Sequence, residues 1–290
     1  MTDELDFITA LRTIATHPAA RGLEDDAAVL EVGGETLVLT HDAMVEGVHF
    51  LPHQDMADVA WKLVATNLSD LAAKGAKPVG VLLGHMLGDN DARFIKGLKE
   101  ALEVFETPLL GGDTVGGTGA ARSFGMTAIG VASHTPVPSR SSAAPGDELY
   151  VTGQIGAAML GFEALRDGTA ACSLAYRRPV PLLEQGIALA PLVTAMMDVS
   201  DGLLLDCWRM ASASGATIQL DPAAIPVADP ARFDECIRWG DDYQLLFTLP
   251  QGMAAPTGAQ RIGTVAARSP SPLRLGDTAF ADKTGLGYTH

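Results

Sequence analysis

The 290-residue sequence is poor in several kinds of residue that mark common protein classes. Its three cysteines are odd in number and form no CxxC pair, so we expect reduced thiols in a cytoplasmic protein rather than disulfides or a zinc site. No run of about 18 apolar residues occurs, which argues against a membrane span. The acidic start at residues 1–6 lacks the basic region of a signal peptide.

Basic residues are scarce as well. Lysine and arginine number 20 against 35 acidic residues, and no lysine occurs between Lys99 and Lys283. The net charge of −15 argues against nucleic-acid binding, because phosphate backbones need a basic surface. Aromatic residues make up only 6% of the chain, whereas 47% is hydrophobic and 31 residues are glycine. This composition favours helices packed closely on sheets, in one large or two ordinary α/β domains.

Acidic residues, by contrast, occur repeatedly at the ends of apolar runs, most clearly in the segment MDVSDGLLLD at residues 197–206. The apolar run ends at Asp198, and Ser200 or Asp201 is expected to cap a helix over 202–213. Asp198 and Asp201 therefore flank a strand-to-helix turn, the place where open α/β folds bind ligands. For this motif taken alone, helix capping is the simpler role.

A second acid stands inside the longest helical pattern, residues 55–75, which is apolar nearly all round and should be buried. An ionised Asp70 in a buried helix costs several kcal/mol unless it is paired or binds a metal. Lys74 lies one turn further on and could pair with it. The helix alone leaves both roles open.

Further acidic turns occur at 25–26, 42, 113 and 241–242, and we interpret 111–117 as a glycine-rich turn, although it is not a Walker A loop. Helix capping alone hardly explains so many acidic turns. The sequence contains no HExxH or GxSxG motif and no evident nucleophile–base set. Oxygen-only ligands suit Mg²⁺ or Ca²⁺, and a carboxylate cluster with few bases indicates several Mg²⁺ ions around a polyphosphate.

Strands and helices alternate along the chain. We expect helices over 3–17, 89–106, 155–167, 182–195 and 229–238, and strands over 36–40, 77–87, 123–133, 148–152, 216–220, 244–249, 261–265 and 273–275. The Pro/Ser-rich stretch 134–147 interrupts this alternation. It predicts two α/β domains, residues 1–135 and 136–290.

Seven segments follow one another in an order that resembles the thiamine-monophosphate kinase family: GLEDDAAVL, DAMVEGVHF, NLSDLAAKGAKP, GGDTVGG, SRSSAAPGD, MDVSDGLLLD and GDDYQLLFT. The resemblance implies a two-domain α/β fold with mixed sheets, shared with aminoimidazole ribonucleotide synthetase, whose N-terminal halves dimerise through their sheets. It also implies phosphorylation of thiamine monophosphate to thiamine diphosphate. The γ-phosphoryl group of ATP would be transferred directly, with the help of Mg²⁺.

Matching motif by motif, the resemblance implies three sets of site residues. Several Mg²⁺ ions would be held at Asp26, Thr40, His41, Asp42, Asp70, Asp113, Asp198 and Asp201. ATP would be contacted by Gly112, Asp113, Arg140 and Ser200. Thiamine phosphate would be contacted by His49, Asp241 and Tyr288, and we expect the Tyr288 ring to stack on the cationic thiamine ring.

The sequence departs from the family pattern at a few positions. Glu24 replaces a usual glycine, His41 a usual Ser or Thr, and Lys74 a usual Met, while Asp241 and Gln244 replace usual glutamates. Another ATP-dependent enzyme of the same fold, or a non-catalytic Mg-nucleotide-binding module, is the alternative function. Helix 55–75 and strand 77–87 are too apolar to face water in a half-domain, so we expect a homodimer formed through the N-terminal half.

Overall fold

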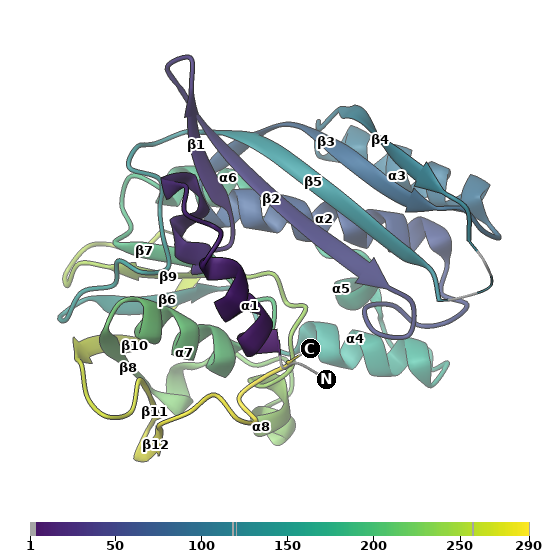
Figure 1. The fold of residues 1–290 in the computed structure, drawn as a ribbon. Helices are drawn as coiled ribbons and strands as arrows, with labels where there is room; N and C mark the ends of the chain where they lie inside the picture. Colours follow the sequence, from purple (N-terminus) through teal and green to yellow (C-terminus); the bar gives the residue numbers. More distant parts are fainter. Residues whose placement is uncertain (1–3, 118, 120, 257, 290) are drawn as a thin grey trace.

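A computed structural model describes residues 4–117, 119, 121–256 and 258–289. The chain forms two β-sheets, one in each half, with helices packed on and between them (Figure 1). The segment that joins the two sheets runs from the end of the last strand of the first sheet to residue 147, across the predicted domain seam. No helix in the described part of the chain is both long and apolar enough to cross a membrane.

The N-terminal sheet is mixed and has the strand order β1-β2-β5-β3-β4. Its strands are β1 (Ala28–Val32), β2 (Glu35–Val45), β3 (Ala76–Met86), β4 (Leu109–Val115) and β5 (Ser123–Ala132). Neighbouring strands are antiparallel except for β3 and β4, which are parallel. Helices α2 (Met56–Ala73) and α3 (Asp91–Val104) lie on one face of this sheet (Figure 1). α1 (Glu4–Arg12) and the short helix η1 (Pro18–Leu23) precede it.

Helix α2 is the centre of the molecule. Every residue except Asp70 is buried, and Asp55 caps the helix by accepting a hydrogen bond from the amide of Ala57 at 2.9 Å. The helix contacts the N-terminal sheet and α3, and also α5, α6 and β7 of the C-terminal half. The predicted burial of this helix is confirmed. Because the C-terminal half of the same chain covers this helix, the burial of the helix does not by itself require a second chain.

The C-terminal sheet has seven strands in the order β12-β11-β8-β10-β6-β9-β7. They are β6 (Glu148–Thr152), β7 (Ala195–Asp198), β8 (Ala216–Leu220), β9 (Leu245–Leu249), β10 (Ala259–Ala267), β11 (Leu273–Leu275) and β12 (Thr278–Phe280). The helices of this half are α4 (Ala157–Arg166), α5 (Leu174–Arg177), α6 (Leu183–Leu189), α7 (Leu203–Ala213) and α8 (Phe233–Cys236), with the short helices η2 (Pro222–Ala224) and η3 (Pro230–Arg232). Pairing is antiparallel except between β11 and β8.

The glycine-rich segment is not the turn that the sequence suggested. Residues Leu109–Val115 form the exposed edge strand β4, which pairs along its length with β3. A Cβ atom on Gly112 would lie 1.9 Å from the carbonyl oxygen of Leu83. Glycine at this position therefore permits the close approach of two strands, a use that propensity alone does not reveal. Expected helices 3–17 and 182–195 are also shorter, ending at Arg12 and Leu189.

Candidate active site

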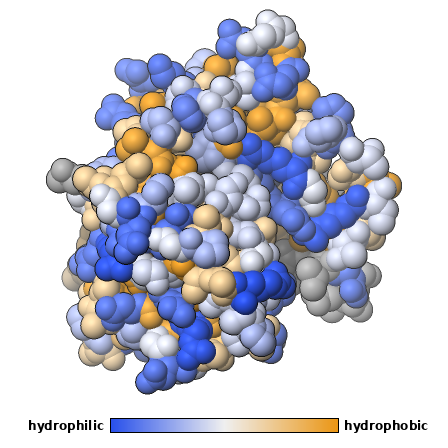
Figure 2. Space-filling view, turned by 90° about the vertical axis from the view of Figure 1, so that its left-hand side faces the viewer, coloured by the Kyte–Doolittle hydropathy of each residue, from blue (hydrophilic) through white to orange (hydrophobic). Residues whose placement is uncertain are grey.

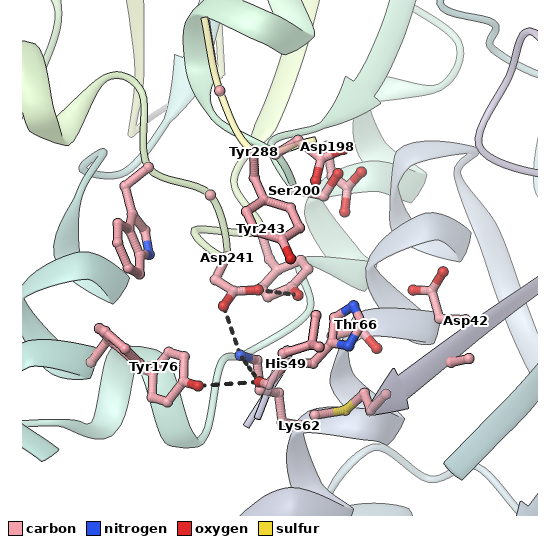
Figure 3. Close-up of a pocket in the computed structure, with 18 of the residues that line it drawn as sticks. Asp42, His49, Lys62, Thr66, Tyr176, Asp198, Ser200, Asp241, Tyr243 and Tyr288 are labelled. Carbon is pink, nitrogen blue, oxygen red and sulfur yellow. Dashed lines mark hydrogen bonds and ion pairs between the residues drawn. The ribbon is translucent and has the colours of Figure 1, made fainter. Parts of the chain in front are cut away.

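A cavity of about 680 Å³ lies between the two halves of the chain. Its walls come from the end of β2, from α2, from the turn after β7, from the loop before β9 and from the C-terminal segment (Figure 3). Among the predicted site residues, those that line it are Asp42, His49, Asp70, Asp198, Ser200, Asp201, Asp241 and Tyr288. Segments distant in sequence thus supply one concave surface, the usual form of a small-molecule site.

Three carboxylates converge at one end of this cavity. Asp26, Asp70 and Asp198 each present an oxygen atom within 4.8 Å of the others. Thr40 donates its hydroxyl to Asp70, and Ser69 donates its hydroxyl to Asp198, so both carboxylates are held in place. The three acids come from the segment before β1, from α2 and from the end of β7. The fold therefore brings together residues that are separated by up to 172 positions in the sequence, from Asp26 to Asp198.

The charges at this end are not balanced by protein cations alone. Burial, followed by the nearby charge of Asp26, raises the pKa of Asp198 to about 8. Burial likewise raises the pKa of Asp42 to about 6 and that of Asp70 well above its usual value. Burial and mutual repulsion therefore disfavour the simultaneous ionisation of these neighbouring carboxylates. A divalent cation would remove that restriction.

The donor set of the cluster fits a hard divalent cation. All of its donors are carboxylate oxygens, the ligand type that Mg²⁺ and Ca²⁺ prefer. The Asp26 side chain is only 5% exposed, and its Oδ2 atom lies 2.7 Å from the Lys74 ammonium. A buried carboxylate group that faces two further carboxylates is well placed to share a metal ion with them.

The expected alternative for Asp70, an ion pair with Lys74, is wrong. The Lys74 ammonium turns away from it and pairs with Asp25 and with Asp26, 2.7 Å from Asp26 Oδ2. Arg140 pairs with the other oxygen of Asp26. Asp70 therefore accepts a hydrogen bond from Thr40 and remains available to a cation bound in the cluster.

The turn after β7 is built differently from the sequence expectation. Gly202, not Ser200 or Asp201, occupies the N-cap position of α7. The Asp206 carboxylate folds back and accepts hydrogen bonds from the amides of Ser200 and Asp201, both at 3.1 Å. This leaves the side chains of Asp198, Ser200 and Asp201 on the cavity wall. Arg209 pairs with Asp201 at 2.5 Å.

The other end of the cavity is built around Asp241 (Figure 3). Its Oδ2 atom accepts from the Lys62 ammonium at 2.7 Å, and its Oδ1 atom accepts from the Tyr243 hydroxyl at 2.7 Å. Lys62 also donates to the carbonyl oxygen of His49 at 3.2 Å and lies 3.9 Å from the centre of the Tyr176 ring. Asp241 has a left-handed φ of 64°. Such a conformation is uncommon outside glycine and is held here by tertiary contacts.

Lys62, Tyr176 and Tyr243 line the cavity but were missed by sequence reasoning. A signal for Lys62 was present, because a lysine inside a helix predicted to be buried needs an acidic partner. The partner itself lies 179 positions away and could not be named from the sequence.

His49 and Tyr288, the other residues predicted to contact the substrate, also line the cavity. The Nδ1 atom of His49 accepts a hydrogen bond from the amide of Val45 at 3.0 Å, so the neutral imidazole carries its proton on Nε2. Tyr288 is 46% exposed, and its backbone amide donates to the carbonyl oxygen of Asp201 at 2.9 Å. This bond fastens the C-terminal segment to the acidic turn, which places an aromatic ring beside it.

Family models match both halves of the chain. Residues 24–132 match the AIR synthase related protein N-terminal domain, and residues 144–269 match the C-terminal domain of the same group. The chain is 36% identical to the thiamine-monophosphate kinase of Escherichia coli K12 over 254 residues, covering 79% of this chain and 76% of that protein. It is 41% identical to that of Caulobacter vibrioides over 241 residues, covering 79% and 68%.

The chain belongs to the thiamine-monophosphate kinase family. Among solved structures, it is similar to AaThiL complexed with AMPPCP and TMP, with a TM-score of 0.88 and 26% identity, covering 99% of this chain and 97% of that one. The thiamine-monophosphate kinase of Stenotrophomonas maltophilia K279a gives a TM-score of 0.75 and 29% identity, covering 94% and 96%. The expected family and two-domain fold with mixed sheets are confirmed.

Three residues that the kinase-family pattern assigns to metal or ATP lie apart from the cavity. His41 points to the open face of the N-terminal sheet, where its Nδ1 atom is 2.9 Å from the Thr127 hydroxyl, while Thr40 and Asp42 point to the α2 face. Gly112 lies on β4, three strands away from Asp42 on β2. The register runs from Asp42 through Met126 on β5 and Leu83 on β3 to Gly112, so about 14 Å separate the two residues. By strand alternation Asp113 faces the open side of the sheet.

Proposed function

We propose that the protein transfers the γ-phosphoryl group of ATP to thiamine monophosphate, giving thiamine diphosphate, the last step in the biosynthesis of that compound. The observation that carries this proposal is one cavity with a carboxylate cluster at one end and an aromatic, ion-paired pocket at the other. Phosphoryl transfer needs in-line positioning and charge stabilisation rather than a covalent intermediate. The family to which the chain belongs supports the same reaction.

The acidic end would hold Mg²⁺ through Asp26, Asp42, Asp70 and Asp198, with Asp201 beside them. Bound there, the cation would neutralise phosphate charge and favour the departure of ADP. Arg140 is a partly exposed cation at the same end, where it pairs with Asp26. We infer that it turns towards the ATP phosphates, and that Ser200 contacts them from the turn after β7. His41 would contribute only through its backbone.

The other end would hold thiamine monophosphate. Asp241 is fixed by two donors and presents a negative charge to the cavity, which suits the positively charged thiazolium ring. The Tyr288 ring would stack on the thiamine moiety. In the tautomer set by Val45, the Nε2–H of His49 would donate to a phosphate or amine acceptor of the substrate.

We further propose that the protein is a homodimer formed through the open face and edge of the N-terminal sheet. Its exposed apolar side chains there are Val79, Leu82, Leu109, Leu110 and Val115. Figure 2 looks at the molecule from the opposite, β1 side, where apolar residues are also exposed in the upper half. Gly112 and Asp113 lie on the edge strand, away from the cavity of their own chain. In a dimer they could serve the site of the partner.

Sedimentation at micromolar concentration tests the assembly. We expect a species near twice the chain mass of 30.2 kDa, and a single 30 kDa species would contradict the dimer. A cytoplasmic location, and the absence of nucleic-acid binding, stay predictions.

The reaction itself is tested by coupling ADP release to thiamine monophosphate. We expect ATP consumption that requires both Mg²⁺ and thiamine monophosphate, with thiamine diphosphate as the product. Binding of ATP and Mg²⁺ without turnover would instead indicate a non-catalytic nucleotide-binding module. Turnover that ignores thiamine monophosphate would indicate another reaction on the same fold.

A further inference from the structure

Two lysines are almost wholly buried in the described part of the chain, Lys62 and Lys74, with relative exposures of 1% and 0%. Lys62 belongs to the substrate end described above. Lys74 stands at the acidic end, where it makes three polar contacts: with Asp25 Oδ1, with Asp26 Oδ2 at 2.7 Å, and with the carbonyl oxygen of Met196 at 3.2 Å. The contacts with Asp25 and Met196 are hydrogen bonds, and the contact with Asp26 is an ion pair.

The position of this ammonium is fixed by the same elements that fix the carboxylates. Lys74 is the C-cap residue of α2, one turn after Asp70, and its amide donates to the carbonyl oxygen of Asp70 at 3.2 Å. Met196 lies on β7, two residues before Asp198. A change in the place of Lys74 would therefore require α2 or β7 to move. The lysine is part of the rigid frame of the acidic cluster.

The other cations near the cluster differ in this respect. Arg140 pairs with Asp26 and Arg21 pairs with Asp25, but their side chains are 16% and 20% exposed. Both are therefore open to solvent in part and able to change partners when a phosphate binds. Lys74 has no exposed surface, so it could exchange its carboxylate partners for a ligand only if α2 or β7 moved.

We propose that the Lys74 ammonium is a built-in cation of the metal site, which occupies one coordination direction of Asp26 and takes the place of a divalent ion there. This inference rests on the proposed function, because it assumes that the cluster binds Mg²⁺. Asp42, Asp70 and Asp198 form no ion pair with a lysine or arginine of the described chain, so they remain for divalent ions. The wild-type site consequently binds one divalent ion fewer than the same site without the lysine.

Counting bound Mn²⁺ in wild type and Lys74→Met tests this directly. Met keeps the length and flexibility of the side chain but removes its charge. Titration followed by electron paramagnetic resonance, with a non-hydrolysable ATP analogue present, gives the number of ions per chain. We expect one additional Mn²⁺ per chain in Lys74→Met. An unchanged number, whatever the affinity, overturns the proposal.

Thermal melting gives a second readout that does not depend on activity. In EDTA, Lys74→Met should melt roughly 6–10 °C below wild type, because removing one partner of a buried ion pair costs about 3–5 kcal/mol. Saturating Mg²⁺ should restore most of the loss. Lys62→Met is the matched control: it removes the other buried ammonium, remote from the cluster, and its loss should not be restored by Mg²⁺.

Charge compensation separates the proposal from simple misfolding. Asp25 is not among the proposed Mg²⁺ ligands, and Lys74→Met with Asp25→Asn removes one negative charge together with the positive one. This double variant should regain stability in EDTA. A Lys74→Met protein that Mg²⁺ fails to stabilise, or that melts like wild type in EDTA, contradicts the inference. If wild type itself binds no Mn²⁺, the proposed metal site fails; if both proteins bind equal numbers, only the role of Lys74 fails.

Discussion

The carboxylates at the two ends of the cavity differ in the partners that the protein gives them. At the substrate end, Asp241 has a protein donor on each oxygen, Lys62 and Tyr243. At the acidic end, Asp70 and Asp198 receive hydroxyl hydrogen bonds but no ion pair from a lysine or arginine of the described residues. A balanced end can recognise a ligand by shape and modest charge, whereas an unbalanced end requires an external cation.

The contrast predicts that neutralising the acidic end has the largest effect on turnover. Asp198→Asn keeps the shape of the side chain but removes a charge that would hold Mg²⁺ against ATP. We expect a loss of about a hundredfold or more in turnover, comparable to deleting one electrostatic donor, with partial recovery at high Mg²⁺. Asp201→Asn should follow the same pattern. Steady-state rates against Mg²⁺ concentration measure the loss, and unchanged melting shows that the variants are folded. Near wild-type turnover in both would contradict the metal site.

Breaking the balanced end should affect substrate binding and stability instead. Lys62→Met leaves Asp241 half-paired, so we expect the KM for thiamine monophosphate to rise tenfold or more, with little change in the KM for ATP. The loss of a buried ion-pair partner should also lower the free energy of unfolding by about 3–5 kcal/mol. Initial rates with each substrate varied in turn measure the first effect. Equal changes in both KM values would show that the two ends are not separate.

A smaller effect is expected from the aromatic ring at the mouth of the cavity. Tyr288→Ala should weaken binding of thiamine monophosphate about five- to tenfold, the size of a cation–π contact, and leave ATP binding unchanged. Calorimetric titration with each ligand separates the two. Tyr288→Phe is the matched control, because it keeps the ring, and it should bind almost like wild type. If the alanine variant binds both ligands normally, the ring only packs the C-terminal segment.

The sequence predicted the acidic end better than the substrate end, for a physical reason. Asp70 and Asp198 could be found because acid inside or directly after an apolar run is unusual and costly. Helix α2 was found from its apolar periodicity. Lys62 and Asp241 are 179 positions apart and Lys74 and Asp25 are 49 apart, so these pairs appear only when the chain is folded.

Two errors also have physical causes. The glycines of β4 suggested a turn, but pairing with β3 overrides their weak strand propensity. Ser200 and Asp201 are good capping residues, yet Asp206 binds their amides from inside α7 and Gly202 takes the cap position. The orientation of His41 was within reach of sequence reasoning. Alternation along β2 places it opposite to Thr40 and Asp42.

The smallest expected effect concerns Asp242, which follows Asp241 in the sequence but does not line the cavity. Its carboxylate accepts hydrogen bonds from the amides of Gly156 and Ala158, at 2.7 and 3.2 Å, at the start of α4. Burial raises its pKa from 3.8 to about 7 in the folded protein. The folded state therefore holds this proton more tightly than the unfolded state, and the stability that this gives is lost as pH rises from about 4 through 7.

We therefore expect the melting temperature of Asp242→Asn to fall less steeply than that of wild type between pH 5.5 and 7.5. One titrating group changes the free energy of unfolding by at most ~1.4 kcal/mol per pH unit, which corresponds to a shift in melting temperature of about 3 °C per pH unit. Asparagine does not titrate, so the slope due to this site disappears even if the variant is less stable overall. Melting in EDTA at closely spaced pH values, with Asp241→Asn as the neighbouring control, measures the difference in slope. Equal slopes in wild type and Asp242→Asn would show that Asp242 stays ionised, held by the two amides of α4.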